Sequence, residues 1–142
     1  MADLKRYTVE NMSRTASLTL RIIYAACLLG ATCNHVLWLW QHGAFWNFGF
    51  RDASLFSRIF WTSLTFLDPL AALLLFLRPR VGLVLTVAII ASDVLNNSVV
   101  VDSLLNPKYL LQVAFLLFVS LTVLVAWRGV CLKPKHNVTQ TL

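Results

Sequence analysis

Charged residues are scarce in this sequence. Asp, Glu, Lys and Arg together make up 13% of its 142 residues, whereas they supply about a quarter of an ordinary soluble domain. Hydrophobic residues make up 58%, too many for a chain of this length to bury in one core without exposing large apolar patches. The composition therefore argues against a soluble domain and predicts that lipid surrounds the apolar segments.

Cysteine is also rare, and its pattern argues against chemistry based on paired thiols. Cys27, Cys33 and Cys131 form no C-x-x-C motif, and the first two would lie about 120° apart around a helix. The sequence also lacks a Ser-His-Asp order, a Gly-rich phosphate loop and a nucleotide fingerprint. His35 and His42 share one helical face, a spacing that suits neither haem nor zinc. We therefore predict no cofactor and no metal, and the sequence favours a non-enzymatic protein over an enzyme.

Four long apolar runs divide the chain. Each is near the roughly 20 residues that a helix needs to cross about 30 Å of hydrocarbon, and they cover residues 18–40, 56–77, 81–105 and 109–127. Arg-Pro-Arg at 78–80 and Asn-Pro-Lys at 106–108 are very short connections, which predict antiparallel neighbours. The predicted fold class is all-α, a transmembrane four-helix antiparallel bundle at 18–127 between cytoplasmic tails at 1–17 and 128–142.

Lys and Arg are distributed unevenly around these runs. Three lie on one side, at Arg51, Arg58 and Lys108. The other nine lie on the side of the two termini: Lys5, Arg6, Arg14, Arg21, Arg78, Arg80, Arg128, Lys133 and Lys135. Because cytoplasmic segments carry the excess of Lys and Arg, both termini are predicted to be cytoplasmic. The basic residues flank apolar runs and form no continuous face, so the expected partner is a lipid bilayer and not a nucleic acid.

The connection between the first two runs, residues 41–55, is rich in aromatic residues. The aromatic residues in and around it are Trp38, Trp40, Phe45, Trp46, Phe48, Phe50 and Trp61. Aromatic rings favour the headgroup layer, where an indole N–H still meets water. We expect an interfacial anchor here, and the alternative is a lid over a ligand site.

A few polar side chains interrupt the runs. The candidates for a polar pocket or a proton relay are His35, Asp68, Asp93, Asn96, Asn97 and Gln112. A carboxylate at mid-bilayer costs at least about 2.5 kcal/mol, so we expect Asp68 and Asp93 to face the bundle interior and to be paired, hydrated or protonated. The helical rise places both roughly 15 to 18 Å from the cytoplasmic boundary. In this common layer, two facing carboxyls would share a proton.

A second predicted layer lies nearer the outer face. His35, Asn97 and Gln112 come from three helices at comparable depth and could line a polar pocket. Asp93, Asn96 and Asn97 form one stripe on the third helix. The structural alternative is that these groups only bond across helices and hold the bundle together.

Asp68 has a structural alternative of its own. Pro69 follows it directly, and proline suits the first turn of a new helix. The second helix could therefore kink or restart at this point, with Asp68 as its N-cap.

Three short motifs accompany the four-helix layout. They are Leu-Asp-Pro-Leu at 67–70, Leu-Arg-Pro-Arg at 77–80 and Ser-Asp-Val-Leu-Asn at 92–96. With these motifs, residues 18–127 resemble small bacterial four-helix membrane proteins of the DoxX-like type, which implies a bacterial inner membrane. That group is similar in fold to sterol-isomerase-like proteins, whose buried acidic residues line a ligand cavity. Here the acids within the runs are Asp68 and Asp93, and none is a glutamate.

Three functions remain open from the sequence. The first is a non-enzymatic bundle that binds a small lipophilic ligand or another membrane subunit through a polar-lined pocket, alone or as an oligomer. The second is a proton-coupled transporter or relay that uses Asp68 and Asp93. The third is a membrane isomerase or redox enzyme with a lipophilic substrate.

Overall fold

The computed structural model describes residues 2–49, 53–101, 103 and 105–132, most of which are helical. The helices are α1 (Ala2–His42), α2 (Leu55–Leu77), α3 (Pro79–Val100) and α4 (Pro107–Cys131). All four are long and apolar enough to cross a membrane, which confirms the predicted all-α, four-helix transmembrane class. Residues 133–142 of the predicted C-terminal tail, like Phe50 and Arg51 of the first connection, lie outside the described residues.

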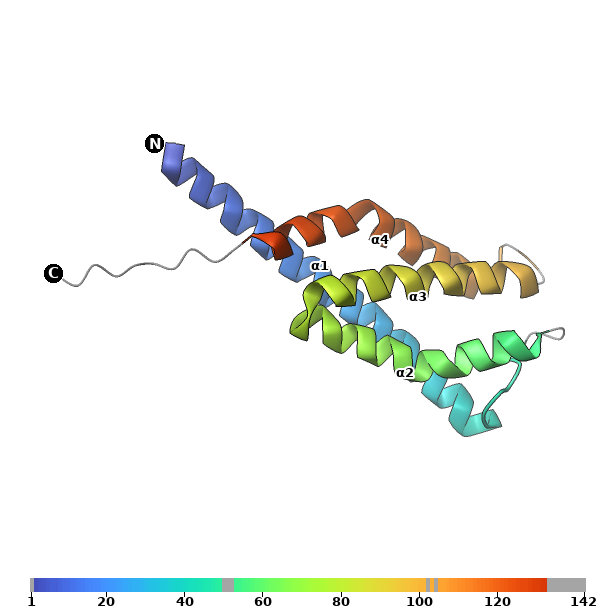
Figure 1. Ribbon diagram of the computed structural model, residues 1–142. Helices are drawn as coiled ribbons and strands as arrows, with labels where there is room; N and C mark the ends of the chain where they lie inside the picture. Colours follow the sequence, from blue (N-terminus) through green and yellow to red (C-terminus); the bar gives the residue numbers. More distant parts are fainter. Residues whose placement is uncertain (1, 50–52, 102, 104, 133–142) are drawn as a thin grey trace.

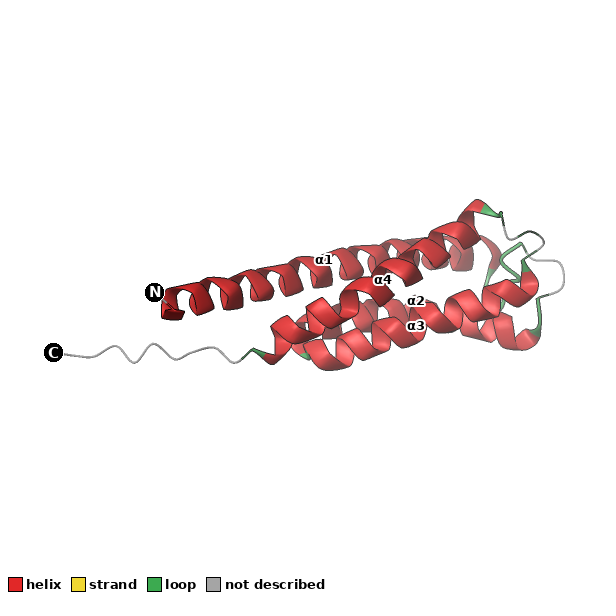
Figure 2. Cartoon of the chain, turned by 90° about the horizontal axis from the view of Figure 1, so that it is seen from above, coloured by secondary structure: helices red, strands yellow, loops and turns green. Residues whose placement is uncertain are grey.

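The four helices pack in a ring (Figure 1). Each packs against its neighbour along the chain, and α1 also packs against α4. Figure 2 shows the same arrangement from above, with the N-terminus and the end of α4 at one end. We call this the terminal end, and it also holds the α2–α3 connection. The loop end is the opposite one, with the connections at 43–54 and 101–106.

Helix α1 is much longer than the predicted span at 18–40. Its 41 residues extend over about 60 Å, twice the thickness of the hydrocarbon core. No glycine precedes Gly30 and no proline precedes Pro69, so nothing in residues 2–17 breaks the helix. This segment, predicted as a cytoplasmic tail, is a helical arm that projects beyond the other helices at the terminal end (Figures 1 and 2).

The limits of α3 and α4 differ from the predicted ones. Helix α3 ends at Val100 and not at residue 105, because Val101 is extended and its N–H bonds to the carbonyl of Asn97. The apolar run thus contains a turn, between α3 and α4, that polar side chains stabilise and that hydropathy does not reveal. Ser103 Oγ accepts the N–H of Leu105, and Asn106 Oδ1 caps α4 by accepting the N–H of Lys108. Helix α4 then continues to Cys131, beyond the predicted limit at residue 127.

Helix α2 continues through Pro69 without restarting. The proline lies inside the helix, and the N-cap is Ser54, whose Oγ accepts the N–H of Ser57. The hypothesis that Asp68 caps a second helical segment is therefore wrong. Proline has no N–H, so the Thr65 carbonyl one turn earlier loses its helical donor, yet packing keeps the helix intact.

Two small residues bring helix backbones together near the terminal end. A Cβ on Gly82 of α3 would lie 2.3 Å from the backbone N of Leu75 in α2, and a Cβ on Gly129 of α4 would lie 2.3 Å from Cβ of Ser17 in α1. Ser17 Oγ also donates a hydrogen bond of 2.6 Å to the carbonyl of Ala126. Small residues and hydroxyl bonds of this kind hold membrane helices together where the hydrophobic effect cannot.

Candidate functional site

The buried side chains divide the bundle into two halves. In the half towards the terminal end, the buried hydrophobic residues are Tyr24, Leu28, Ala71, Ala72, Leu75, Leu83, Ile89, Val119 and Ala126. Most buried polar residues lie at mid-bundle or nearer the loop end, at His35, Ser57, Thr65, Asp68, Asp93 and Asn97. A site for polar chemistry therefore belongs to the loop half of the bundle.

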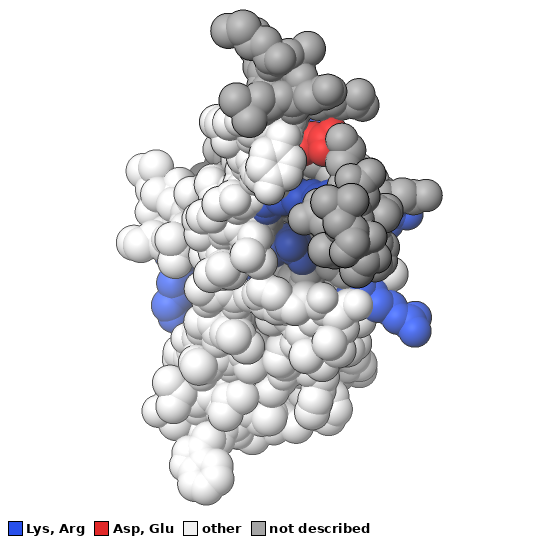
Figure 3. All heavy atoms as spheres, turned by 90° about the vertical axis from the view of Figure 1, so that its left-hand side faces the viewer, with Lys and Arg blue, Asp and Glu red and all other residues white. Residues whose placement is uncertain are grey.

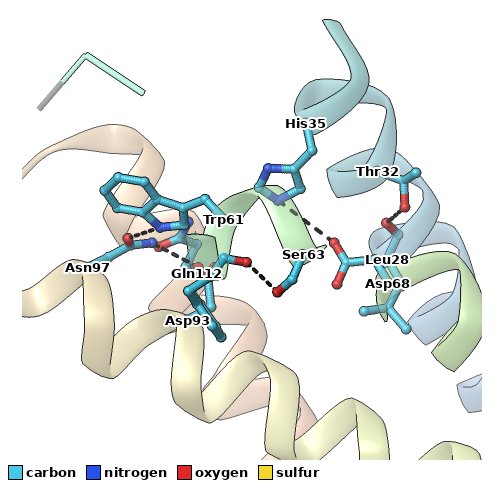
Figure 4. Close-up of polar contacts among 10 residues, drawn as sticks. Leu28, Thr32, His35, Trp61, Ser63, Asp68, Asp93, Asn97 and Gln112 are labelled. Carbon is cyan, nitrogen blue, oxygen red and sulfur yellow. Dashed lines mark hydrogen bonds and ion pairs between the residues drawn. The ribbon is translucent and has the colours of Figure 1, made fainter. Parts of the chain in front are cut away.

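Asn97 of α3 is the centre of a hydrogen-bond network that joins three helices (Figure 4). Its Oδ1 accepts the indole N–H of Trp61 on α2 at 2.8 Å. Its Nδ2 donates to Gln112 Oε1 on α4 at 2.7 Å and to Asp93 Oδ1 at 3.1 Å. Both ends of the Asn97 amide are thus used, so its orientation is fixed.

His35 of α1 and Asp68 of α2 form a second polar contact. His35 Nε2 lies 3.8 Å from Asp68 Oδ2, too far for a hydrogen bond, and both side chains are buried. Figure 4 shows His35 extending from α1 towards this carboxyl. Asp68 Oδ2, His35 Nδ1 and Thr65 Oγ1 have no hydrogen-bond partner among the described residues. Buried polar groups that no protein group satisfies call for an explanation, and a role in binding or catalysis is one.

The two predicted acids share one region of the bundle but have different partners. Asp68 lies within the electrostatic influence of Asp93. Asp93 bonds to Asn97, one turn further along α3, whereas the nearest partner of Asp68 is His35. No hydrogen bond joins the two carboxyls in the described part of the chain.

Asn96 faces a different neighbour from Asn97. Its Oδ1 accepts a bond of 2.9 Å from Ser57 Oγ on α2, and its Nδ2 is buried without a partner among the described residues. It does not line the cavity that Asp93 and Asn97 share. The predicted stripe on α3 therefore separates: Asp93 and Asn97 line the cavity, whereas Asn96 bonds to Ser57 away from it.

A cavity of about 60 Å³ lies between the helices at the loop end. Its lining residues are Asn34, His35, Trp38, Phe48, Trp61, Asp93, Asn97, Val101, Lys108, Tyr109 and Gln112. Asn34 and Lys108 are exposed, whereas Asp93 and Asn97 are buried. The cavity thus leads from the bundle surface to a carboxyl and two amides. Asp68 does not line it and contacts it only through His35.

Phe48 closes the cavity from the loop between α1 and α2. Its ring makes edge contacts with Trp61 at 5.2 Å and with His35 at 5.7 Å between ring centroids. Its φ of 54° is in the left-handed region, an uncommon conformation for a residue other than glycine. The ring nevertheless packs on Trp61 and His35, so this loop conformation places Phe48 in the cavity wall.

A ladder of stacked rings forms the neighbouring wall. His42 stacks on Trp38 at 5.0 Å and on Trp46 at 4.5 Å, and the Lys108 ammonium lies 5.1 Å from the centre of the Trp38 ring. This ladder joins α1, the first loop and the start of α4. Such aromatic and cation–π contacts stabilise a rim that is partly exposed to water.

Trp61 is the main residue of the cavity lining whose position we predicted wrongly from the sequence. We expected it in an interfacial aromatic belt, but it is only 2% exposed and bonds to Asn97. Its distance of seven residues from Asp68 on α2 puts both on one helical face, a signal that could have indicated burial. The position of Phe48 had no such signal, because it depends on the path of a loop.

These features define a polytopic integral membrane protein with a small polar cavity in one half of its bundle. Comparison with models of protein families, with curated proteins and with solved structures gives no match.

Proposed function

We propose that this membrane protein binds the hydrogen-bonding head group of a small amphipathic molecule in the cavity at its loop end. One observation carries the proposal: the cavity connects the exposed Asn34 and Lys108 with the buried Asp93 and Asn97. Polar groups at the inner end of an apolar bundle fix the orientation of a ligand, while the surrounding lipid accommodates its apolar part.

The size of the cavity supports a head group rather than a whole ligand. Pockets that enclose drug-sized molecules measure about 300–1,000 Å³, whereas this one measures about 60 Å³. At about 30 Å³ per molecule of liquid water, the space suits a polar group of a few heavy atoms. An exposed position such as Asn34 allows the rest of the molecule to lie along the α1–α4 side.

The lining chemistry favours a head group that donates hydrogen bonds. Asp93 presents a carboxyl, and the side-chain oxygens of Asn97 and Gln112 accept bonds in the same network. Trp38 already holds the Lys108 ammonium at the exposed rim, whereas Tyr109 adds an aromatic wall and the Asp93 carboxyl is the buried charged group of the lining. The proposed ligand class is therefore a lipophilic amine or alcohol, and a carboxylate is disfavoured.

Three probes with the same chain test this proposal: hexylamine, hexanol and hexanoate. Their retention by the detergent-solubilised protein is measured by native mass spectrometry. Hexylamine or hexanol should bind at least about tenfold more tightly than hexanoate, because juxtaposed like charges cost several kcal/mol. Equal retention of all three would contradict the proposed chemistry.

Neighbouring positions on α1 provide a matched pair of variants. Asn34→Phe places a ring at the cavity rim and should abolish retention of the probe. Cys33→Phe adds the same ring at an exposed position that does not line the cavity, so retention should not change. If both variants retain the probe equally, the cavity is not its binding site.

The proposal includes an orientation, with both termini in the cytoplasm of a bacterium and the cavity near the outer leaflet of the inner membrane. The nine-to-three distribution of Lys and Arg supports it, as does the resemblance of the layout to DoxX-like proteins. Reporter fusions at each terminus test it, since either terminus on the outer side would contradict it.

A second candidate function is the exchange of protons between Asp68 and water on the loop side of the membrane only. The His35–Asp68 contact favours it. His35 lines the cavity and lies 3.8 Å from Asp68, so it could pass a proton between the cavity and this carboxyl. The apolar layer beneath, with Leu75, Leu83 and Val119 fully buried, argues against transfer through the whole bundle. Asp68→Asn and Asp93→Asn should then each reduce the number of protons that the detergent-solubilised protein binds, as measured by potentiometric titration, without changing the fold.

A further inference from the structure

A second cavity, of about 330 Å³, lies at the terminal end of the bundle. Its walls come from α1, from the start of α3 and from the end of α4, and they include Arg14, Leu18, Arg21, Pro79, Gly129 and Val130. It shares no lining residue with the cavity near Asp93. We call it the arginine pocket.

Arg14 and Arg21 lie on one face of α1, because seven residues turn a helix by nearly two full turns. Arg21 donates Nη1–H to the carbonyl of Leu75 at 2.9 Å and Nε–H to the carbonyl of Ser17 at 3.3 Å. These acceptors are neutral, and no ion pair of Arg21 occurs among the described residues. A guanidinium has five N–H donors, so its remaining donors are available to an anion.

The contact between α1 and α4 fixes where these arginines lie. Ser17, between them along α1, packs against Gly129 and bonds to Ala126. Arg14 Nη2 donates to the carbonyl of Leu132, just beyond the end of α4. Both guanidiniums are thus held beside the pocket by backbone contacts.

The whole terminal end is strongly basic. Among the described residues, the Lys and Arg of this end number seven, against two acids, Asp3 and Glu10; they are Lys5, Arg6, Arg14, Arg21, Arg78, Arg80 and Arg128. Figure 3 looks onto this end, where Lys and Arg atoms gather near the middle of the face and at both flanks. The field at the arginine pocket therefore favours anions.

The pocket also lies level with the ends of helices long enough to span a membrane, where lipid head groups are expected. Arg21 bonds to the last turn of α2 and lies beside Pro79, the first residue of α3, so it is level with the ends of two spans. Leu18 is 45% exposed beside it and adds an apolar wall. The volume equals roughly eleven waters at about 30 Å³ each, enough for a phosphate and the glycerol carbons next to it.

We propose that the arginine pocket binds the phosphate of an anionic phospholipid from the leaflet at the terminal end. Arg21 donates to the phosphate oxygens and Arg14 adds positive charge beside it, in the manner of basic pockets between membrane helices. Leu18 and Val130 contact the glycerol and the start of the acyl chains. This inference is independent of the ligand at the loop end.

Native mass spectrometry of the full chain in mixed micelles tests the inference, with phosphatidylglycerol and phosphatidylcholine as probes. The protein should retain phosphatidylglycerol preferentially, and Arg21→Gln should weaken its retention about tenfold, the effect of losing one charge-assisted contact. Val130→Trp fills the pocket without removing a charge and should weaken retention too, which covers the case in which Arg21→Gln does not fold.

Arg128→Gln is the matched control, because Arg128 is exposed at the same end but does not line the pocket. It should leave the preference nearly unchanged. A loss as large as that of Arg21→Gln would mean that only the overall charge attracts the lipid, and would overturn the site. Displacement of the lipid by inorganic phosphate at equal concentration would also overturn it, in favour of a site for free phosphate.

Discussion

Trp61 donates its indole N–H to Oδ1 of Asn97 at 2.8 Å, and both side chains are buried between α2 and α3. Trp61→Phe keeps the aromatic packing but leaves the Asn97 oxygen without this donor. We expect a loss of about 1 kcal/mol in the free energy of unfolding, the usual magnitude for interhelical bonds in membranes. Unfolding in mixed micelles by a denaturing detergent measures it. Trp40→Phe, at a position 88% exposed, should have no effect, and an equal loss in both variants would contradict the role of this bond.

Gly82 and Gly30 should respond in opposite ways to alanine. A Cβ on Gly82 would lie 2.3 Å from the backbone of Leu75, which cannot move away without separating α2 from α3. Gly82→Ala should therefore destabilise the bundle by about 1–3 kcal/mol. Gly30 has open space around it, and Gly30→Ala should stabilise the helix by up to about 1 kcal/mol. Thermal unfolding in one detergent compares them, and the same sign for both would contradict this prediction.

Phe45 and Phe48 allow strain to be separated from packing. Both have positive φ, 63° and 54°, and glycine relieves strain of this kind by about 1 kcal/mol. Phe45 is 51% exposed, so Phe45→Gly should raise the melting temperature slightly. Phe48→Gly should lower it, because the contacts with Trp61 and His35 are lost. A rise in both variants would show that Phe48 contributes nothing to closing the cavity.

Asp93 and Asp68 should differ in ligand binding, because only Asp93 lines the cavity. Asp93→Asn keeps the size of the side chain but removes its charge, and should weaken binding of hexylamine about tenfold, as expected for the loss of a charged partner. Asp68→Asn should change it little. Native mass spectrometry with hexylamine compares the two variants. Equal losses would mean that the carboxyls act as a unit, which would favour proton exchange.

The helices could be predicted because the signal for each is local. Length and hydropathy identified four spans, and short charged turns indicated their antiparallel order. The errors occurred where polar atoms compete for the backbone: Ser103 and Asn106 stabilise a turn inside an apolar run. The length of α1 was missed because its first residues are polar and only continue an existing helix.

The site was harder to predict from the sequence, because it depends on how each helix is rotated about its axis. The helical rise gives the depth of Asp68 and Asp93, but not which neighbour each one faces. In the structure the partner of Asp93 is Asn97, and that of Asp68 is His35. The position of Phe48 depends on the path of a loop that contains two glycines with positive φ, Gly43 and Gly49. No periodic pattern in the sequence predicts the path of such a loop.

The single-residue connection at Arg78, together with the backbone contact between Gly82 and Leu75, makes α2 and α3 a rigid hairpin. Helices α1 and α4 have no such short link, and their close approach at Ser17 and Gly129 lies near the terminal end. Towards the loops, side chains join these two helices: the Tyr24 hydroxyl bonds to that of Thr122, and the Lys108 ammonium lies over the Trp38 ring. A molecule that entered between the first helix and the last would therefore have to displace Lys108 from Trp38 before it reached Asp93.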